Sequence, residues 1–370
     1  MNRRRALVAR GLGFYRTHER WMGVVFFLGG IAWDLLTLRR IDNWVDNTIL
    51  LSYFGVLGVI IGLHGALVGS VRVPAMIEKT REWIPLAIQF VLGALLSALV
   101  IFYARSVTWT SGSAFWVALV IGLLGNEVMH RRKTSFAALT VTYFAVGATL
   151  AAYLVPVIAG RLGLDLFRVA LAVALIPAGA LMLYGFRVGA FETRARLALT
   201  MLSIVLLGNM LDVGYRNNWI PPVPLSLRHG GIYEQVAREG NDFLLSYHTD
   251  MSGRWLPGLF SPDYARRVHW APGDTVFAFS AIFAPTGLRQ RMVHSWQRQD
   301  STGWTPVDDV SYEVHGGRDD GYRGTTFKRR MKAGKWRVVV QTADGRVLSR
   351  IPFEIIEGSE PPSEVRTLRR

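Results

Sequence analysis

MKAGKWRVVVQTADGRVLSRIPFEI (331–355) decides the fold of the C-terminal part of this chain. Two runs of alternating apolar and polar residues flank the pair Asp344-Gly345, which predicts a β-hairpin with a two-residue type I′ turn. Trp336, Val338 and Val340 recur with period two, so one face of this hairpin should be buried. The pattern is typical of a water-soluble domain, although about two hundred mostly apolar residues precede it.

The same alternation predicts more strands upstream of the hairpin. They are PGDTVFAFSAIF (272–283), LRQRMVHSW (288–296), DVSYEVH (309–315) and YRGTTFKRR (322–330). Short strands at this spacing predict an all-β antiparallel sandwich over residues 265–356. Residues 214–264 are predicted to be a linker and irregular segment, in which GIYEQVAREG (231–240) is typical of a short helix and DFLLSYH (242–248) of a short strand. The polar tail, 357–370, is predicted to be disordered.

Residues 21–213 predict an α-helical transmembrane bundle of about seven spans, because each apolar block has about the 20 residues that cross a bilayer. The predicted spans are 21–38, 48–70, 84–103, 113–130, 135–158, 165–186 and 196–213. The whole chain is 51% hydrophobic and 19% charged, against about 25% charged residues in a soluble domain.

Basic residues predict the orientation of these spans, because Lys and Arg are retained on the cytoplasmic side. With the N-terminus inside, fifteen Lys and Arg fall on the inner side and five on the outer side. An odd number of spans then places residues 214–370 outside the cytoplasm. Residues 1–20, with six Arg and one Glu, are predicted to be a basic cytoplasmic segment lying at the inner surface, although they also resemble a secretory or transit peptide.

The net charge of +15 does not predict a nucleic-acid partner. Of the 42 Lys and Arg, 20 lie before residue 213, together with 10 of the 27 Asp and Glu, so the apolar part carries +10 and the rest only +5. The chain has no cysteine, which excludes disulfides, thiolate metal sites and a cysteine nucleophile.

Polar side chains inside the predicted membrane region are candidate functional residues, because burying them in lipid is costly. Asp34 and Asp212 are predicted near the outer side, where they would bind a cation or a basic group. His64 and Glu127 are predicted near the inner side, where they would relay protons or orient water. The alternative for all four is a structural hydrogen bond, and for Glu127 an ion pair with Arg131.

Five glycines form one stripe on the second predicted span. They are Gly55, Gly58, Gly62, Gly65 and Gly69. Such a stripe lets a neighbouring helix approach closely. It predicts either a sliding interface or, as the favoured alternative, tight static packing.

Residues 265–356 resemble a bacterial domain of unknown function of the twenty-nine-fourteen type. The resemblance rests on the His294-x-Trp296 strand, the Tyr322-Arg323 pair, and the Gly334-x-Trp336 strand followed by the Asp-Gly hairpin. The run GTTF (324–327) departs from the aromatic and serine that often follow Tyr-Arg in this family. The resemblance implies a β fold that follows a multi-span region in the bacterial inner membrane and faces the periplasm, and it implies no established activity.

His294, Trp296, Arg323 and Trp336 are the candidate binding residues of the β domain, as an aromatic and basic patch for a glycan or an acidic partner. The alternative is that both tryptophans are core residues and that Arg323 pairs with Asp319 or Asp320. No nucleophile elbow, P-loop, dinucleotide fingerprint or zinc spacing is present, so no catalytic residue, metal or cofactor is assigned and an enzyme is not favoured.

The sequence therefore predicts a membrane protein that anchors an extracytoplasmic β-sandwich, which binds an envelope protein or glycan as a scaffold or accessory. The alternative is a transporter or intramembrane enzyme that acts on a lipid-linked or small polar substrate through Asp34, His64, Glu127 and Asp212. A sensor that couples the sandwich to the cytoplasmic loops ranks last, because those loops are short.

Overall fold

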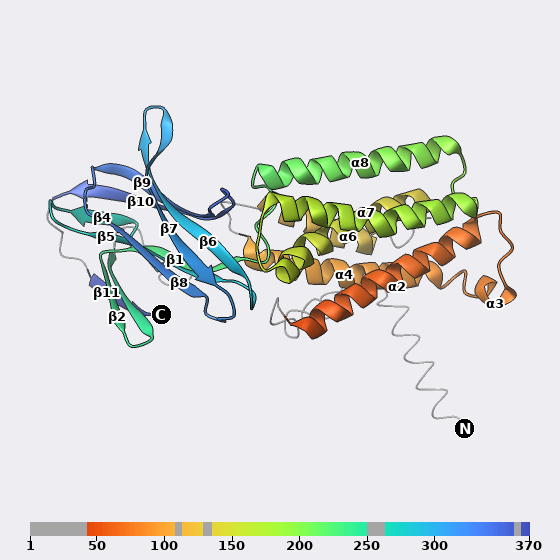
Figure 1. Cartoon of the computed structure of the whole chain (residues 1–370), viewed down its shortest axis with the longest axis horizontal. Coiled ribbons are helices and arrows are strands. Elements are labelled where there is room, and N and C mark those ends of the chain that lie inside the picture. Colours follow the sequence, from red (N-terminus) through yellow and green to blue (C-terminus); the bar gives the residue numbers. More distant parts are fainter. Residues whose placement is uncertain (1–42, 108–112, 129–134, 250–262, 359–363) are drawn as a thin grey trace, which may run out of the picture.

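The computed structural model describes residues 43–107, 113–128, 135–249, 263–358 and 364–370. A helical bundle precedes a β domain that docks on one end of it (Figure 1). The predicted span 21–38 and the basic segment 1–20 lie outside the described residues. The helices are α2 (Trp44–Val68), α3 (Ala75–Glu78), α4 (Ile84–Ser106), α5 (Ser113–Val128), α6 (Phe136–Ala159), α7 (Leu164–Arg187) and α8 (Arg194–Arg216).

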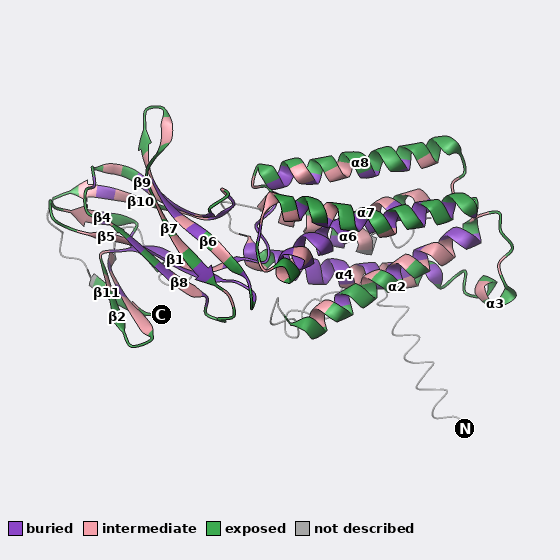
Figure 2. Cartoon of the chain, viewed as in Figure 1, coloured by how far each residue is buried: buried purple, intermediate pink, exposed green. Residues whose placement is uncertain are grey.

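Each predicted span within the described residues coincides with a helix, and five of these helices are long and apolar enough to cross a membrane. The described part of α5 has 16 residues, about 24 Å, which is shorter than the roughly 30 Å hydrocarbon core. Large apolar side chains such as Val59, Phe90, Ile176 and Leu199 are exposed. Figure 2 shows long exposed stretches, in green, on α2, α7 and α8. Apolar side chains in such positions indicate contact with lipid.

The glycine stripe on α2 packs against α6 and α7. A Cβ at Gly58 would meet the ring of Tyr143 at 2.9 Å, and a Cβ at Gly65 would meet the ring of Phe136 at 2.6 Å. Phe54 on the same helix stacks on Tyr143 with ring centroids 4.3 Å apart. These contacts favour static packing over a sliding interface, because rings fill the space that the glycines leave.

The β domain contains a mixed, mostly antiparallel set of sheets. Its strands are β1 (Ser226–Tyr233), β2 (Gln235–Glu239), β3 (Asp242–Thr249), β4 (Arg267–Trp270), β5 (Val276–Phe283), β6 (Arg289–Asp300), β7 (Gly303–His315), β8 (Tyr322–Lys328), β9 (Gly334–Thr342), β10 (Val347–Glu357) and β11 (Glu364–Arg369). They form one sheet in the order β1-β5-β8, a second in the order β4-β10-β9-β6-β7, and a small third in the order β11-β3-β2.

The first two sheets pack face to face over a core that includes Trp296, Trp336, Val338 and Phe353 (Figure 2). Burial of alternate residues on β9 explains this packing, since Trp336, Val338 and Val340 are all buried, as the period of two predicts. The sandwich is not all antiparallel, however, because β4 pairs with β10 in the parallel direction.

Three predictions for the ends of the β domain are wrong. GIYEQVAREG forms the end of β1 and the strand β2, and no helix. The segment 214–264 is not irregular throughout, since β1, β2 and β3 lie in it. The tail is not disordered over residues 364–369, which form β11 and pair with β3. The strands β2, β3 and β11 stabilise one another by pairing, and this pairing cannot be predicted from each short segment alone.

The predicted hairpin between β9 and β10 is present, but its turn differs. The amide of Gly345 donates to the carbonyl of Thr342 at 2.9 Å, and the amide of Thr342 donates to the carbonyl of Arg346 at 2.9 Å. Gly345 alone in this turn has a positive φ, of 81°. The loop thus has three residues ending on a left-handed glycine, in place of the two-residue type I′ turn that needs positive φ at both positions.

The β domain docks where α4, α6 and α8 end, which we call the docking end of the bundle. Asn218, just after α8, accepts from the amide of Val347 at 3.1 Å and donates to the carbonyl of Gly345 at 3.3 Å. The buried guanidinium of Arg346 donates to the carbonyl of Tyr215 and lies 4.3 Å from the centre of its ring. At the end of α6, the amide of Arg289 donates to the carbonyl of Gly160 at 2.9 Å.

Candidate functional site

The structure does not bring the predicted intramembrane polar residues together. Asp34 lies outside the described residues, and Glu127 lies on α5 with a side chain that is not described. His64 is half-buried one turn before the end of α2, where that helix meets the end of α7. Asp212 lies on α8 beside the start of α7. Since α7 has 24 residues, His64 and Asp212 are on the order of 30 Å apart.

Asp212 is an ion-paired residue of the docking end. Its carboxylate accepts from the guanidinium of Arg168 at 2.9 Å and also from Arg216, one turn further along α8. The side chain of Asp212 is only 13% exposed. Two guanidinium groups hold the carboxylate, so a cation would have to displace them, and this arrangement favours the structural alternative for Asp212.

The predicted aromatic and basic patch of the β domain is not on its surface. His294 and Trp296 are 0% exposed and Trp336 is 2% exposed, so all three belong to the interior of the sandwich. Arg323 lies on the opposite face of the β1-β5-β8 sheet and donates to the carbonyl of Asn241 at 2.6 Å. The burial of Trp296 and Trp336 agrees with the alternative prediction, in which both tryptophans are core residues.

His294 is the centre of a buried hydrogen-bonded network that joins the two sheets. Its Nε2 lies 2.9 Å from Ser280 Oγ and 3.0 Å from the hydroxyl of Tyr312, and its Nδ1 lies 2.9 Å from Thr326 Oγ1. The indole of Trp296 donates to the same Thr326 oxygen at 3.2 Å. Ser280 and His294 have the separation of a nucleophile and base, but both are fully buried, so a substrate has no access to them.

The His294 network suits a neutral imidazole, which has one donor and one acceptor nitrogen. With Nδ1 accepting from Thr326 and Nε2–H donating to the pair Ser280 and Tyr312, every nitrogen is satisfied. Desolvation by burial lowers the pKa of His294 from its usual 6.5 to about 3. The histidine is therefore uncharged at neutral pH and has a structural role.

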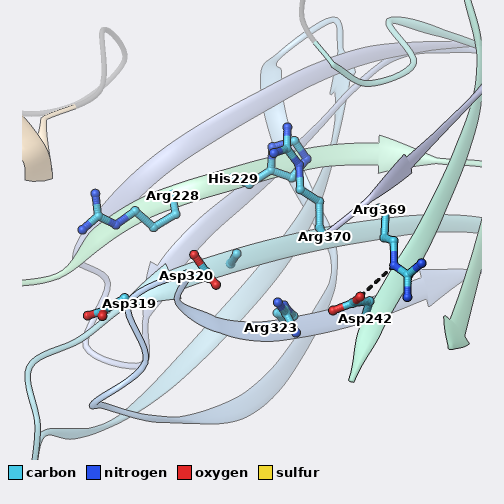
Figure 3. A pocket seen from close by; sticks show the side chains of 9 residues that line it. Arg228, His229, Asp242, Asp319, Asp320, Arg323, Arg369 and Arg370 are labelled. Carbon is cyan, nitrogen blue, oxygen red and sulfur yellow. Dashed lines mark hydrogen bonds and ion pairs between the residues drawn. The ribbon is translucent and has the colours of Figure 1, made fainter. Parts of the chain in front are cut away.

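A charged pocket, which sequence reasoning missed, lies on the other face of the β1-β5-β8 sheet (Figure 3). It has a volume of about 580 Å³. Four arginines, three aspartates, one histidine and one alanine line it. These are Arg228, His229, Asp242, Ala281, Asp319, Asp320, Arg323, Arg369 and Arg370. We call this the arginine pocket.

Strand register explains why these residues meet. His229 pairs with Ala281, and Ala281 pairs with Arg323, so the three form one row across the sheet. Ala281 is the small residue in the middle of the row and provides the floor. A β-bulge between Leu227 and His229 turns Arg228 towards the same side. The strands β3 and β11 and the loop before β8 add the remaining walls.

Two interactions fix the polar side chains at the edge of the arginine pocket. Arg369 donates to Asp242 at 2.7 Å, as Figure 3 shows, and Arg370 donates to Asp263 at 3.3 Å. Their partners hold both guanidinium groups beside the cavity. The pocket therefore has positioned donors at the end of β11, as recognition of a ligand requires.

His229 contributes a neutral ring to the arginine pocket. The hydroxyl of Tyr233 donates to the carbonyl of Asp263 at 2.9 Å, so its oxygen accepts from His229 Nε2 at 2.6 Å. The remaining ring nitrogen, Nδ1, is then an acceptor. Burial, and secondly the charge of Arg370, lower the pKa of His229. The pocket thus combines cationic donors, carboxylate acceptors and one neutral imidazole.

Metal binding finds no support in the part of the chain that the structure describes, where no group of three or more His, Cys, Asp or Glu side chains could hold an ion. The chemistry of the arginine pocket is different. Guanidinium groups bind carboxylates and phosphates with two parallel hydrogen bonds, and neighbouring carboxylates accept from hydroxyl groups.

Comparison with known families gives one match. Residues 289–355, from β6 to β10, match a family described as "Protein of unknown function (DUF2914)". This match confirms the resemblance for the strands β6 to β10. The matched residues do not include β1, β3 or β11, which line the arginine pocket. Among curated proteins, none matches this chain.

Solved structures show only weak likeness to this chain. A β-glucosidase from Listeria innocua in complex with glucose is 12% identical over 25% of this chain and 15% of that chain, with a TM-score of 0.18. Its complex with gluconolactone covers 31% and 16% at the same TM-score. An alkylpurine DNA glycosylase from Pseudomonas fluorescens, bound to DNA with an abasic site analogue, is 11% identical over 84% and 99%, with a TM-score of 0.17. The chain spans about 15% of the length of the β-glucosidase, and we transfer no fold or activity from these structures.

Proposed function

We propose that this chain is an integral protein of the bacterial inner membrane that holds its β domain in the periplasm, where the domain binds an envelope protein or glycan. The docking of the β domain carries the proposal. The domain lies at one end of the bundle, held by Asn218, Arg346 and the end of α6. Such contacts keep the domain against the membrane surface in a defined orientation.

The distribution of basic residues supports this orientation. The end of the bundle away from the β domain, which we call the basic end, has six Lys and Arg within the described residues. The six are Arg72, Lys79, Arg81, Arg187, Arg194 and Arg196. At the docking end, Arg168 and Arg216 pair with Asp212, and Arg161 pairs with Asp165. Because basic loops are retained in the cytoplasm, this distribution supports a position of the β domain outside it.

Single-cysteine labelling tests the orientation, because the chain has no cysteine of its own. Ser301→Cys lies at the exposed tip of the β6–β7 hairpin, and Thr80→Cys lies at the basic end. In spheroplasts, a membrane-impermeant maleimide should label Ser301→Cys but reach Thr80→Cys only after lysis. Labelling in the opposite order would place the β domain in the cytoplasm and end the proposal.

Binding is tested with the whole chain in nanodiscs and a fractionated envelope extract, with empty nanodiscs as the control. Retained material that is lost after protease treatment of the extract would identify a protein partner. Material that is lost after cleavage of glycans would identify a saccharide. If the chain retains no more than empty nanodiscs do, the binding role is wrong.

A further inference from the structure

We infer that the arginine pocket is the binding site of the β domain and that its ligand is an anionic saccharide, a sugar that carries a carboxylate or phosphate group. This inference rests on the proposed function and specifies its glycan alternative. The pocket is built from β1, β3, β5, β8, β11 and the loop before β8, which lie far apart in the sequence.

Arg228 and Arg323 are the groups that recognise the anionic part of the ligand. A guanidinium has five N–H donors, so the bond from Arg323 to the carbonyl of Asn241 positions that side chain and leaves most of its donors for a ligand. Arg228 lies 5.0 Å from the centre of the Phe283 ring, which orients its guanidinium without using a donor. Arg369 and Arg370 instead donate to the carboxylates of Asp242 and Asp263.

The carboxylates of the pocket indicate that the ligand also has hydroxyl groups. Asp319 and Asp320 are exposed on the loop before β8 and border the same cavity. They would repel a bare anion, but they accept hydrogen bonds from sugar hydroxyls. His229 Nδ1 is a further acceptor. A ligand with one acidic group and several hydroxyls therefore satisfies both kinds of side chain.

Size and shape favour a saccharide over an inorganic ion. The volume of about 580 Å³ lies within the range of roughly 300–1,000 Å³ for small-molecule sites and exceeds what one phosphate needs. Polar atoms dominate the lining, which contains only one apolar residue, Ala281. A lipid tail would lack apolar contacts there, so the pocket itself fits the polar part of a ligand.

One side of the pocket borders the docking end. Arg228 is close enough to Arg105, in the last turn of α4, for the two charges to interact. Phe283, beneath Arg228, belongs to the hydrophobic core of the bundle. A saccharide attached to a lipid in the outer surface of the membrane and a free saccharide of the envelope share the same chemistry, and both can reach a pocket in this position.

The test uses the whole chain in nanodiscs and four probes in calorimetric titration. Methyl glucuronide and glucose 1-phosphate are the anionic sugars, methyl glucoside is the neutral sugar, and inorganic phosphate is the bare anion. We expect the anionic sugars to bind at least tenfold more tightly than either control. Nanodiscs that contain glucuronosyl diacylglycerol give the lipid-linked arm: a lower affinity for free methyl glucuronide there shows that the lipid-linked sugar occupies the pocket.

Substitutions locate the site. Arg228→Gln and Arg323→Gln should each weaken binding of methyl glucuronide at least tenfold, whereas Arg330→Gln, an equal change of charge on an exposed residue outside the pocket, should leave it unchanged. Ala281→Leu should abolish binding by filling the cavity without a change of charge. Circular dichroism and the melting temperature of each variant show that the β domain is folded.

Three results would overturn the inference. If methyl glucoside binds as tightly as the anionic sugars, the charge of the ligand is not recognised. If phosphate binds as tightly as they do, the sugar is not recognised. If Arg330→Gln weakens binding as much as Arg228→Gln and Arg323→Gln do, the ligand does not bind in the arginine pocket. If envelope glycans bind to the chain and to Arg228→Gln alike, the pocket is wrong and the proposed function stands. If neither extract nor probe binds, both are wrong.

Discussion

Ser280 and Ala281 are neighbours on β5, but their side chains lie on opposite faces of one sheet and belong to two different polar regions. Ser280 contacts His294 in the interior of the sandwich. Ala281 forms the floor of the arginine pocket in a row with His229 and Arg323. Both regions contain a histidine with a lowered pKa, yet one is closed to solvent and the other is open.

The difference lies in how the polar groups are satisfied. In the His294 network, Ser280, Tyr312 and Thr326 provide partners for both ring nitrogens, and no solvent reaches the ring. In the arginine pocket, donors and acceptors line a cavity. A closed network stabilises a unique packing of two sheets, whereas an open one provides groups for a ligand. A lowered pKa alone does not distinguish the two cases.

The largest expected effect comes from His294→Ala. The substitution leaves a cavity and removes the partner of Ser280, Tyr312 and Thr326, so we expect the free energy of unfolding of the β domain to fall by about 3–5 kcal/mol. Pulse proteolysis in urea on the nanodisc-embedded chain measures it. His229→Ala, on the open face, should lower the same free energy by only about 1 kcal/mol. If the two variants lose similar unfolding free energies, the His294 network and the arginine pocket do not differ in how much their histidines stabilise the fold.

The pH dependence of stability should follow His294. Its folded pKa of about 3 lies below the unfolded value of about 6.5, so the unfolded state binds the proton first as the pH falls. The stabilisation is complete above pH 6.5 and decreases by about 1.4 kcal/mol per unit below it, or about 2 kcal/mol from pH 7 to pH 5. His229 contributes in the same direction.

His294→Gln isolates the contribution of His294 to the pH dependence of stability, because glutamine is a polar side chain that does not titrate. Urea unfolding at pH 7 and pH 5 should give a smaller difference in this variant than in the natural chain by about 2 kcal/mol. An unchanged pH dependence would show that His294 is charged in the folded protein.

The sequence predicted the core-facing side of the strands well, but it predicted the side of the β1-β5-β8 sheet that bears the arginine pocket poorly. Period-two alternation identified β5 to β10, because burial against the facing sheet selects alternate residues such as Trp336, Val338 and Val340. Within the described part of the bundle, apolar runs sufficed to predict the helices, five of which are long enough to cross a membrane, because lipid admits only internally bonded helices. His294 was noticed through its motif as a candidate binding residue, with a structural role as the alternative, and the structure shows it to be buried. A strand alone does not show which side is covered.

The arginine pocket was missed because several distant segments build it. Arg228 faces it through a bulge, Asp319 and Asp320 come from a loop, and Arg369 comes from a tail predicted to be disordered. The sequence signal for the strand that carries Arg369, β11, was weak. Val365 and Thr367 have the β-branched character and period of a strand, but only pairing with β3 makes that strand stable.

A matched pair on β5 sharpens the comparison at smaller energies. Ser280→Ala removes a hydroxyl that bonds His294 and Tyr312, so it should cost about 1–2 kcal/mol of unfolding free energy. Ala281→Ser adds a hydroxyl on the adjacent residue, where it faces the open pocket, and should change stability by less than about 0.5 kcal/mol. Urea unfolding of both variants measures the contrast. The comparison fails if the order of the two effects is reversed.

A similarly small effect is expected for the coupling between Arg369 and Asp242 in the arginine pocket. Their side chains are 64% and 36% exposed, so a double-mutant cycle with Arg369→Gln and Asp242→Asn should give a coupling of about 0.2–1 kcal/mol that decreases with salt. A weak coupling is expected for an ion pair at the edge of an open pocket, because water competes for both side chains. A coupling above about 2 kcal/mol would show that this pair is shielded from water as the His294 network is, and the arginine pocket would then not be open at that edge.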